Sequence, residues 1–306
     1  MGAACRAGDR RCLFVTGGAS GIGRATARLF CERGWFVGAY DVDEDGLASL
    51  EQELGRGHCV TRRLDVGEKL EFDRAVADFA EAGGGRCVTR RLDVGDKVDF
   101  DRAVAKFAEA GGGRMDLLFN NAGIGAGGWF EEVPYEVAMR VLQVNFVGVV
   151  NGVYAALPLL RKTPNFLVFS TSSSAAIYGM PRTAMYAATK FAVKGLTEAL
   201  CVELARLGGR AADVLPALVD TAILETTLDY SSGERPGVAM RDSATPEGAM
   251  RLMQPEDVAA SVWQAYEGSD RVHWYVPEEM ENVERARAGG VETLRDQFKK
   301  TVLGGS

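Results

Sequence analysis

Short apolar runs alternate with longer stretches of helical periodicity along most of the chain. The short runs are rich in Val, Leu and Phe, and we predict them as buried strands: Leu13–Thr16, Trp35–Tyr40, Met115–Asn120, Phe166–Ser170 and His273–Val276. The longer stretches carry apolar residues three and four positions apart, and we predict them as helices: Arg24–Arg33, Val133–Leu160, Ala184–Leu207 and Pro255–Tyr266. Strands that alternate with helices predict an α/β fold, with helices on both faces of a doubly wound parallel sheet in three layers.

A tandem duplication interrupts this alternation. Residues 58–85 and 86–113 are identical at 23 of 28 positions. Each copy predicts one strand, Cys59–Leu64 or Cys87–Leu92, followed by an amphipathic helix that ends in glycines. Two copies are too few for a solenoid, which needs at least three. The chain therefore carries a duplicated βα unit.

The sheet has one place for this strand, beside the strand that ends at Asp41. The spare copy must add an edge strand, loop out or displace its twin. Asp65 and Asp93 are the equivalent residues at the ends of the two candidate strands. We expect the first copy to dock, and Asp65 to end the docked strand, because a short connection favours the first copy.

Composition narrows the class of protein. The chain has 306 residues, 47% of them apolar, and a net charge of −7 with a pI near 5.1. An acidic surface argues against a nucleic-acid groove or an anionic membrane as the main partner. The six cysteines show no metal-ligand spacing, which predicts reduced thiols in a cytoplasmic protein and no metal site. The most apolar window, Val141–Leu160, contains Asn145, Asn151 and Pro158, so we predict a buried helix and not a membrane span.

The sequence contains few histidines that could act as a catalytic base. Only His58 and His273 occur, and His58 lies in the duplicated segment, so a histidine base or a Ser-His-Asp triad is improbable. Attention falls on Tyr186 and Lys190 in the sequence YAATK, because residues four apart lie on the same face of a helix. Lowering the pKa of a phenol from ~10 to near neutrality takes about 4 kcal/mol, which one ammonium about 4 Å away supplies at an effective dielectric of ~20. The same spacing also arises by chance in helices rich in Tyr, Lys and Ala.

A glycine-rich turn, TGGASGIG, joins the first strand to the first helix. Gly17, Gly21 and Gly23 would let backbone N–H groups and the positive end of the helix dipole meet a pyrophosphate. Asp41 lies about 20 residues further on, where a carboxylate binds an adenosine ribose and repels a 2′-phosphate, which favours NAD over NADP. The alternatives are a plain strand-to-helix turn, and an Asp41 that caps the next helix.

Three further polar features lie near strand ends or inside a buried helix. NNAG, at positions 120–123, follows a strand, and its glycine permits close approach of the backbone to a cofactor. Asn145 is a polar residue on the apolar face of a core helix and must find hydrogen-bond partners there. The serine cluster at positions 170–174 opens from the strand before the Tyr186 helix, so one hydroxyl can reach the same pocket.

Taken in order, these motifs resemble the short-chain dehydrogenase/reductase family, from about Leu13 to Pro277. The resemblance implies a Rossmann-type domain that oxidises or reduces alcohols and carbonyls with NAD or NADP. It implies that Tyr186 is the general acid/base, that Lys190 lowers its pKa, that Ser173 binds the substrate oxygen and that Asn145 holds a water of a proton relay. By the same resemblance the cofactor contacts are Gly17, Ser20, Gly21, Ile22, Gly23, Asp41, Asp65, Asn121, Ala122, Gly123, Tyr186, Lys190, Val219 and Thr221.

The resemblance also organises the second half of the chain. It implies one domain over residues 1–277, a substrate lid over 222–253 and a peripheral helical tail over 278–306. Ala217 stands where the family usually has glycine, in a segment that would contact the nicotinamide. The family commonly forms homodimers or homotetramers. We therefore expect an NAD-dependent oxidoreductase acting on a small secondary alcohol or ketone; the alternative is a non-catalytic dinucleotide-binding or scaffolding protein of the same fold.

Overall fold

The computed structural model describes residues 10–54, 59–61, 87–242, 244–268, 270–288, 290 and 292, with only the backbone of 59–61, 87–90 and 239–240. Two compact units make up the chain. Unit 1 comprises Met1–Ala122, Gly148–Phe169 and Val202–Arg210, and unit 2 comprises Gly123–Val147, Ser170–Cys201 and Ala211–Ser306.

Unit 1 is built on a parallel sheet. Its strands, in chain order, are β1 (Cys12–Thr16), β2 (Phe36–Asp41), β3 (Cys59–Thr61), β4 (Cys87–Arg91), β5 (Leu117–Asn120) and β6 (Leu167–Thr171), whose last two residues belong to unit 2. The order across the sheet is β3-β4-β2-β1-β5-β6, and the pairs β3/β4, β4/β2, β2/β1 and β1/β5 are all parallel. The strands β1, β2 and β5 are buried almost throughout, as sequence runs without polar alternation predict.

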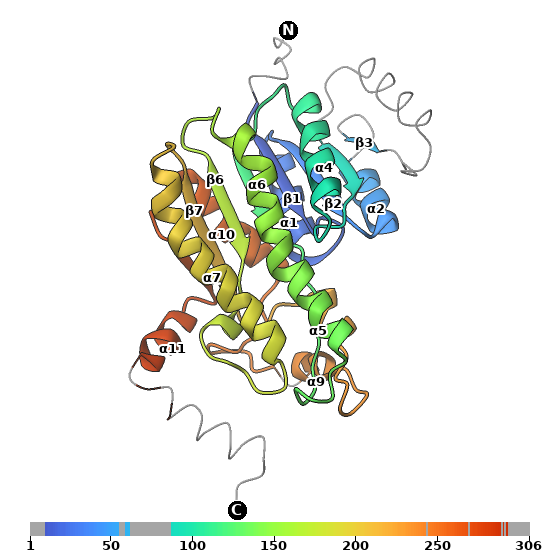
Figure 1. Ribbon diagram of the computed structural model, residues 1–306, viewed down its shortest axis with the longest axis vertical. Coiled ribbons are helices and arrows are strands. Elements are labelled where there is room, and N and C mark those ends of the chain that lie inside the picture. The colour runs from blue at the N-terminus through green and yellow to red at the C-terminus, as the bar shows by residue number, and fades with distance from the viewer. Residues whose placement is uncertain are drawn as a thin grey trace, which may run out of the picture. The chain divides into compact units, whose positions relative to one another are not determined.

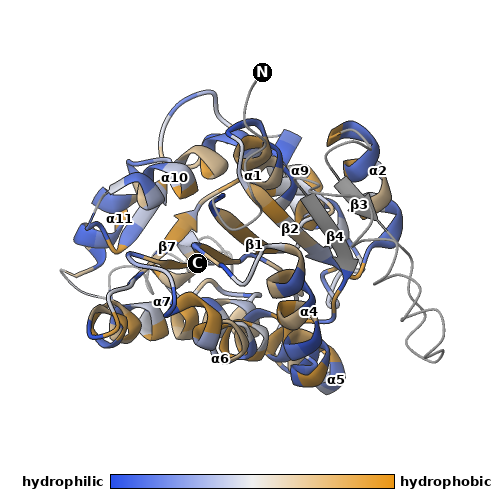
Figure 2. Cartoon of the chain, turned by 90° about the horizontal axis from the view of Figure 1, so that it is seen from above, coloured by the Kyte–Doolittle hydropathy of each residue, from blue (hydrophilic) through white to orange (hydrophobic). Residues whose placement is uncertain are grey.

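Helices cover both faces of the unit 1 sheet. They are α1 (Gly21–Glu32), α2 (Glu44–Leu54), α4 (Lys97–Ala110) and α6 (Gly148–Leu160). Figure 2 shows α1 on one face of β1 and β2, and α4 and α6 on the other, with apolar surfaces turned toward the strands. This is the α/β arrangement predicted from the alternation of strands and helices.

An aromatic stack fills the core between the strands and α4. The Phe14 ring lies 4.1 Å from Tyr40, 5.7 Å from Phe100 and 5.4 Å from Phe107, measured between ring centroids. Each fully buried side chain of this size stabilises the fold by roughly 1.5–3 kcal/mol, and each aromatic pair adds about 0.5–1.5 kcal/mol. A Cβ on Gly38 would lie 2.5 Å from the Phe107 ring, so β2 needs glycine there.

The second copy of the duplicated unit docks beside β2, and the expectation that the first copy would do so is wrong. β4, from the second copy, pairs with β2, with Val37 opposite Cys87 and Asp41 opposite Arg91. β3, from the first copy, pairs in turn with β4 at the edge of the sheet. Asp93 therefore follows the docked strand, and Asp65 lies outside the described residues.

Capping gives a physical reason for this choice, because both copies carry the same phenylalanines. The Asp96 side chain accepts hydrogen bonds from the N–H groups of Val98 and Asp99, at 2.8 and 3.1 Å, and so caps α4. The first copy has Glu68 at this position, and Asp is the better N-cap by the general preference for short polar side chains. We infer that the better-capped helix belongs to the docked copy.

Unit 2 contains the remaining elements. They are α5 (Tyr135–Leu142), a π-helical turn η2 (Gln143–Val147), a 3₁₀ turn η3 (Ser174–Ala176), α7 (Ala184–Ala205), β7 (Arg210–Pro216), α8 (Ala222–Thr226), α9 (Pro236–Asp242), α10 (Pro255–Gly268), β8 (His273–Val276) and α11 (Met280–Arg287). β7 and β8 pair in parallel. In Figures 1 and 2, α7 lies on one face of β7, and α10 lies on the other.

Two helical regions differ from the sequence prediction. The single helix expected over Val133–Leu160 contains the π turn η2, and the segment 222–253, expected to lack periodic structure, contains α8 and α9. The helical stretch Tyr135–Leu160 is long and apolar enough to span a membrane, but 56% of its most apolar window is buried inside the protein. That burial is typical of a core helix.

Candidate active site

The glycine turn of unit 1 has the geometry that an anion-binding turn requires. Gly17 and Gly21 have φ angles of +67° and +48°, in the left-handed region that favours glycine. A Cβ on Gly23 would lie 2.0 Å from the carbonyl oxygen of Gly17, so no other residue fits. Ser20 is the N-cap of α1, and its side chain makes no capping hydrogen bond. The first turn of α1 therefore starts without a protein cap, as expected of a helix N-terminus that binds a phosphate.

Asp41 ties this turn to the end of β2. Its Oδ2 accepts the N–H of Ala19 at 3.0 Å, and its Oδ1 accepts the N–H of Asp43 at 3.1 Å. The helix α2 is capped by Asp43, whose Oδ1 accepts the N–H of Gly46 at 3.0 Å. Asp41 is thus not the residue that caps α2, and it is partly exposed at the carboxyl end of the sheet.

The NNAG segment is held by a residue that the sequence analysis did not single out, Thr16. Its Oγ1 accepts the N–H groups of Asn121 and Ala122, at 2.9 and 3.1 Å. The Asn121 amide in turn donates to the carbonyls of Thr16 and Gly17, at 3.1 and 3.4 Å. A hydroxyl at the end of a strand, directly before the glycine turn, is the signal that could have identified it. Thr16 and Asn121 thereby fix the glycine turn and the NNAG segment to each other within unit 1.

In unit 2, the serine cluster divides its roles among neighbouring residues. Ser173 forms a side-chain hydrogen bond with the Tyr186 phenol, and its Oγ also accepts the N–H of Ala175 at 3.1 Å. Ser172 is buried and donates to the carbonyl oxygen of Lys190 at 2.9 Å. The geometry brings Ser173 to Tyr186, as the spacing predicted, and gives Ser172 the task of anchoring the helix.

Lys190 lies on the same face of α7 as Tyr186. Its Nζ is 5.5 Å from the centroid of the Tyr186 ring and donates a hydrogen bond to the carbonyl of Thr171 at 2.9 Å. The residue is only 3% exposed. Burial disfavours the charged form and lowers the pKa of Lys190 to about 8.

The pKa of Tyr186 departs in the direction opposite to the one expected. We predicted that Lys190 would lower it, whereas burial raises the pKa of Tyr186 above its ordinary value, against a smaller lowering by the Ser173 hydrogen bond. The physical reason is desolvation. Burial disfavours the charged phenolate form of Tyr186, just as it disfavours the charged ammonium form of Lys190, which lies beside the Tyr186 ring. Tyr186 in this protein is therefore protonated at neutral pH.

Asn145 sits in the π turn and is fully partnered, as its burial required. Its Oδ1 accepts the N–H of Ile124, and its Nδ2 donates to the carbonyl of Ile124, both at 2.9 Å. The Nδ2 also donates to Thr189 Oγ1 at 3.3 Å, and Thr189 donates to the carbonyl of Tyr186 at 2.7 Å. Asn145 thus connects the residue after NNAG to the helix that carries Tyr186. π turns are rare and recur at functional sites.

The remaining predicted contacts lie just beyond β7. Val219 forms an isolated bridge with Met253, and Thr221 is the N-cap of α8. The N–H of Ala217 donates to the carbonyl of Val276 at 2.8 Å, so the departure from glycine leaves this turn tied to β8. The structure places Val219 and Thr221 in one turn.

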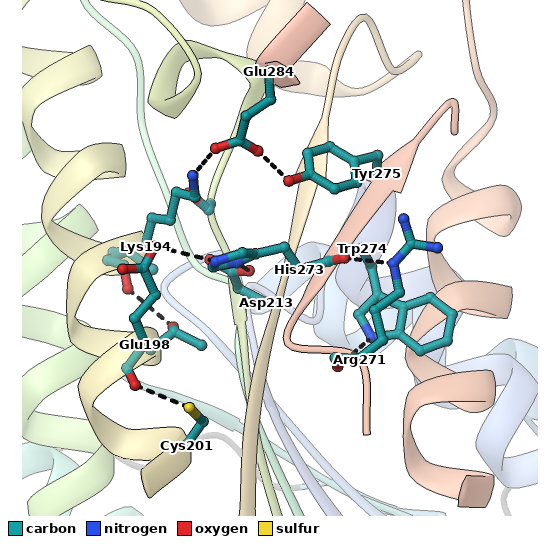
Figure 3. Close-up of polar contacts among 12 residues, drawn as sticks. Lys194, Glu198, Cys201, Asp213, Arg271, His273, Trp274, Tyr275 and Glu284 are labelled. Atoms are coloured by element: carbon teal, nitrogen blue, oxygen red, sulfur yellow. Dashed lines mark hydrogen bonds and ion pairs between the residues drawn. The ribbon is translucent and has the colours of Figure 1, made fainter. Parts of the chain in front are cut away.

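A second polar network lies further along α7, and the sequence analysis missed it (Figure 3). His273 Nδ1 lies 2.7 Å from Asp213 Oδ1, and its Nε2 lies 3.1 Å from Glu198 Oε1. Glu284 of α11 accepts hydrogen bonds from Lys194 and from Tyr275. Burial raises the pKa of Asp213 to about 6, although His273 opposes the change; the pKa of His273 is also raised, since Asp213 outweighs burial. Both imidazole nitrogens of His273 face carboxylates, so His273 joins β8 to β7 and to α7.

Comparisons with known proteins agree with this geometry. The family model described as short chain dehydrogenase matches residues 11–85 and 71–230, two ranges that overlap inside the duplicated segment. The chain is 32% identical over 259 residues to momilactone A synthase of Oryza sativa subsp. japonica, covering 82% of this chain and 81% of that protein. It is 31% identical over 260 residues to L-2,3-butanediol dehydrogenase of Corynebacterium glutamicum, covering 81% and 88%.

Solved structures give the same result. A short chain dehydrogenase/reductase from Burkholderia phymatum in complex with NAD superimposes with a TM-score of 0.71 at 26% identity, covering 95% of this chain and 97% of the other. Levodione reductase superimposes with a TM-score of 0.69 at 26% identity, covering 87% and 95%. The motifs, the parallel sheet and these matches lead to one conclusion: the chain belongs to the short-chain dehydrogenase/reductase family of oxidoreductases.

Proposed function

We propose that this protein transfers a hydride between NAD(H) and a secondary alcohol or ketone, with Tyr186 as general acid and base. The observation that carries the proposal is the constellation on α7 and η3. Tyr186 is hydrogen-bonded to Ser173, Lys190 is buried 5.5 Å from its ring, and Ser172 fixes the backbone of Lys190. A hydroxyl, a phenol and an ammonium in this order are suited to moving a proton onto or off a substrate oxygen.

Proton transfer through Tyr186 follows from its pKa. Because burial keeps the phenol protonated at neutral pH, Tyr186 is ready to donate its proton to the oxygen of a carbonyl that accepts a hydride at carbon. In the reverse direction it takes the hydroxyl proton of an alcohol. Ser173 would orient the substrate oxygen by its third hydrogen-bonding position, beyond those that Tyr186 and Ala175 occupy.

Lys190 and Asn145 support this exchange. The ammonium of Lys190 has three N–H donors, and one of them binds the carbonyl of Thr171. The other two can hold a ribose and stabilise negative charge on the phenol oxygen. Asn145 fixes Ile124 and Thr189, and its place in a π turn suits a residue that opens its helix to a water of the proton relay.

The residues of unit 1 fit a dinucleotide. Gly23 lies so close to the Gly17 carbonyl that the tight glycine turn depends on it, and the N-terminus of α1, which Ser20 does not cap with its side chain, suits a pyrophosphate. Asp41 suits the adenosine ribose of NAD, and its charge disfavours the 2′-phosphate of NADP. When bound, the nicotinamide supplies or accepts the hydride, and the residues of the chain bind it and handle the proton.

The substrate class is supported by the names of the relatives. Butanediol is a secondary alcohol, and a levodione reductase, by its name, acts on a dione. Neither identifies the substrate of this protein. We infer the class from the chemistry that Tyr186 and Ser173 share.

The test combines binding and turnover. The expected result is that NAD raises the melting temperature more than NADP does, and that wild-type protein changes the absorbance of reduced nicotinamide with members of a panel of secondary alcohols and ketones. Tyr186→Phe should bind NAD as the wild type does and lose activity by roughly 10²–10⁴-fold. Turnover that survives this substitution would refute the proposal, and NAD binding without any turnover would favour a scaffolding role.

A further inference from the structure

Asp229 is a buried carboxylate with a complete set of partners, far from the glycine turn in sequence. The residue is 4% exposed. Arg182 reaches it with Nε at 3.1 Å from Oδ2 and with Nη2 at 2.7 Å from Oδ1. The N–H groups of Ser231 and Ser232 each donate to Oδ1 at 3.0 Å. A two-pronged ion pair of this kind fixes geometry as well as charge.

Arg182 is held in an unusual backbone conformation. Its φ is +64°, a left-handed value that strains a residue with a Cβ and persists only where surrounding contacts enforce it. Its carbonyl accepts the N–H of Gly128 at 2.8 Å, and its guanidinium lies 5.1 Å from the centroid of the Trp129 ring. Arg182 therefore joins Asp229 to the loop that contains Trp129.

The backbone of residues 227–230 is hydrogen-bonded directly to the same loop. The N–H of Gly127 donates to the carbonyl of Leu228 at 2.9 Å, and the N–H of Tyr230 donates to the carbonyl of Gly127 at 2.8 Å. A Cβ on Gly125 would lie 2.2 Å from Oγ1 of Thr227. Residues 227–230 thus lie against residues 125–128, with no space for a side chain at Gly125.

Each of the three joined segments is next to a candidate catalytic residue or to the predicted lid. The loop 125–129 follows Ile124, whose N–H donates to the Asn145 side chain. Arg182 precedes Tyr186 by four residues, and the carbonyl of Thr183 accepts the N–H of Ala187 at 2.8 Å at the start of α7. Segment 227–232 lies within the region 222–253, which carries the expected substrate lid.

We propose that Arg182 and Asp229 are positioning residues that lock segment 227–232 into a fixed wall of the substrate site. This inference rests on the proposed oxidoreductase function. The locked wall serves substrate recognition, while proton transfer stays with Tyr186. Trp129 belongs to the same wall. Its ring lies against the Arg182 guanidinium, and its backbone N–H donates to the hydroxyl of Ser231 at 2.7 Å.

The kinetic test separates recognition from chemistry. Asp229→Asn and Arg182→Met should each raise KM for an active secondary alcohol at least tenfold, with kcat within about threefold and with NAD affinity unchanged. The KM of Arg182→Lys should lie between those of the two variants and the wild type, because lysine keeps the charge and loses the two-pronged contact. The control is Arg114→Met, which removes a two-pronged ion pair with the buried Asp116 outside region 222–253 and should leave KM unchanged.

Hydrogen exchange of the unliganded protein tests the lock without turnover. In Asp229→Asn, the amides of Gly127, Gly128 and Tyr230 should exchange at least tenfold faster than in wild type, while those of β7 keep their protection. A fall in kcat at unchanged KM, or unchanged exchange at these amides, would overturn the inference. If wild-type protein turns over no alcohol or ketone, the proposed function fails and the positioning role fails with it, and the exchange rates still decide whether the segments are locked.

Discussion

Helix α7 carries two polar clusters one after the other, and they differ in how their buried charges are compensated. In the first, Tyr186 and Lys190 are buried, and burial sets the direction of both pKa shifts without an opposing charge. In the second, His273 is bracketed by Asp213 and Glu198 (Figure 3). Groups without an opposing charge keep their capacity to exchange protons with a ligand, whereas paired groups hold elements together. The comparison is why we propose the first cluster as the reactive one.

The largest effect we expect comes from Lys190→Met. Activity should fall by about 10²–10⁴-fold, because the ammonium that supports proton transfer is lost. Stability at pH 7 should nevertheless rise by roughly 1–3 kcal/mol, because a pKa lowered from 10.5 to about 8 means that keeping Lys190 charged opposes folding, partly offset by the loss of the bond to Thr171. Urea unfolding and turnover measurements check both.

The lowered pKa of Lys190 fixes the sign of the pH dependence of the stability gain in Lys190→Met. Between pH 8 and 10.5 the unfolded chain binds more protons at this site than the folded one, so wild-type stability rises with pH over that window. The advantage of Lys190→Met should shrink there. An advantage that is constant between pH 7 and pH 10 contradicts the assignment.

His273→Ala should have the opposite effects to Lys190→Met, with lower stability and nearly unchanged activity. Removing one partner leaves Asp213 buried without its counter-charge, which costs about 3–5 kcal/mol in a buried pair. Turnover per folded molecule should stay within about twofold of wild type, because His273 touches neither Tyr186 nor Lys190 in the described contacts. A loss of kcat at full folding would erase the distinction between the two clusters.

The pair Asp213 and His273 predicts a slope of stability with pH. Both folded-state pKa values are raised, so the folded protein holds extra protons, and the stabilisation present at low pH is lost as pH rises through about 6 for Asp213 and then through the pKa of His273. The double variant Asp213→Asn/His273→Gln should flatten this slope by about 1–3 kcal/mol between pH 4 and pH 8. Unfolding free energies at several pH values measure it.

The smallest effect belongs to Lys194→Met, which removes the ion pair with Glu284 one helical turn beyond Lys190. A partly buried pair of this kind contributes about 1 kcal/mol, so the melting temperature should fall by a few degrees. Activity should not change. A large loss of activity would show that the reactive cluster extends along α7 beyond Lys190.

Much of the fold and of the site could be predicted from the sequence, because both depend on local patterns. Apolar runs predict every described strand except β7 (Arg210–Pro216), and they predict β8 with the bounds that the structure has. The position of the serine loop, one strand before the Tyr186 helix, predicts that one of its hydroxyls can reach the same pocket, and Ser173 interacts with the Tyr186 phenol. The roles of these residues in turnover stay predictions.

Non-local effects account for what the sequence could not predict. The choice between the two repeat copies depends on the cap at Asp96 and on sheet pairing, and both copies share the same apolar pattern. The sign of the Tyr186 pKa shift depends on burial, which a spacing rule does not contain. The partners of the His273 side chain come from β7 and α7, two elements that lie far from β8 in the chain.

The central claim is that burial leaves Lys190 with an unusually low pKa beside Tyr186, and titration of that one ammonium tests it most directly. NMR of lysine labelled at Cε, with Lys190→Met to assign the signal, should show a midpoint near pH 8 in the unliganded protein. A midpoint at the ordinary value near 10.5 would contradict the account.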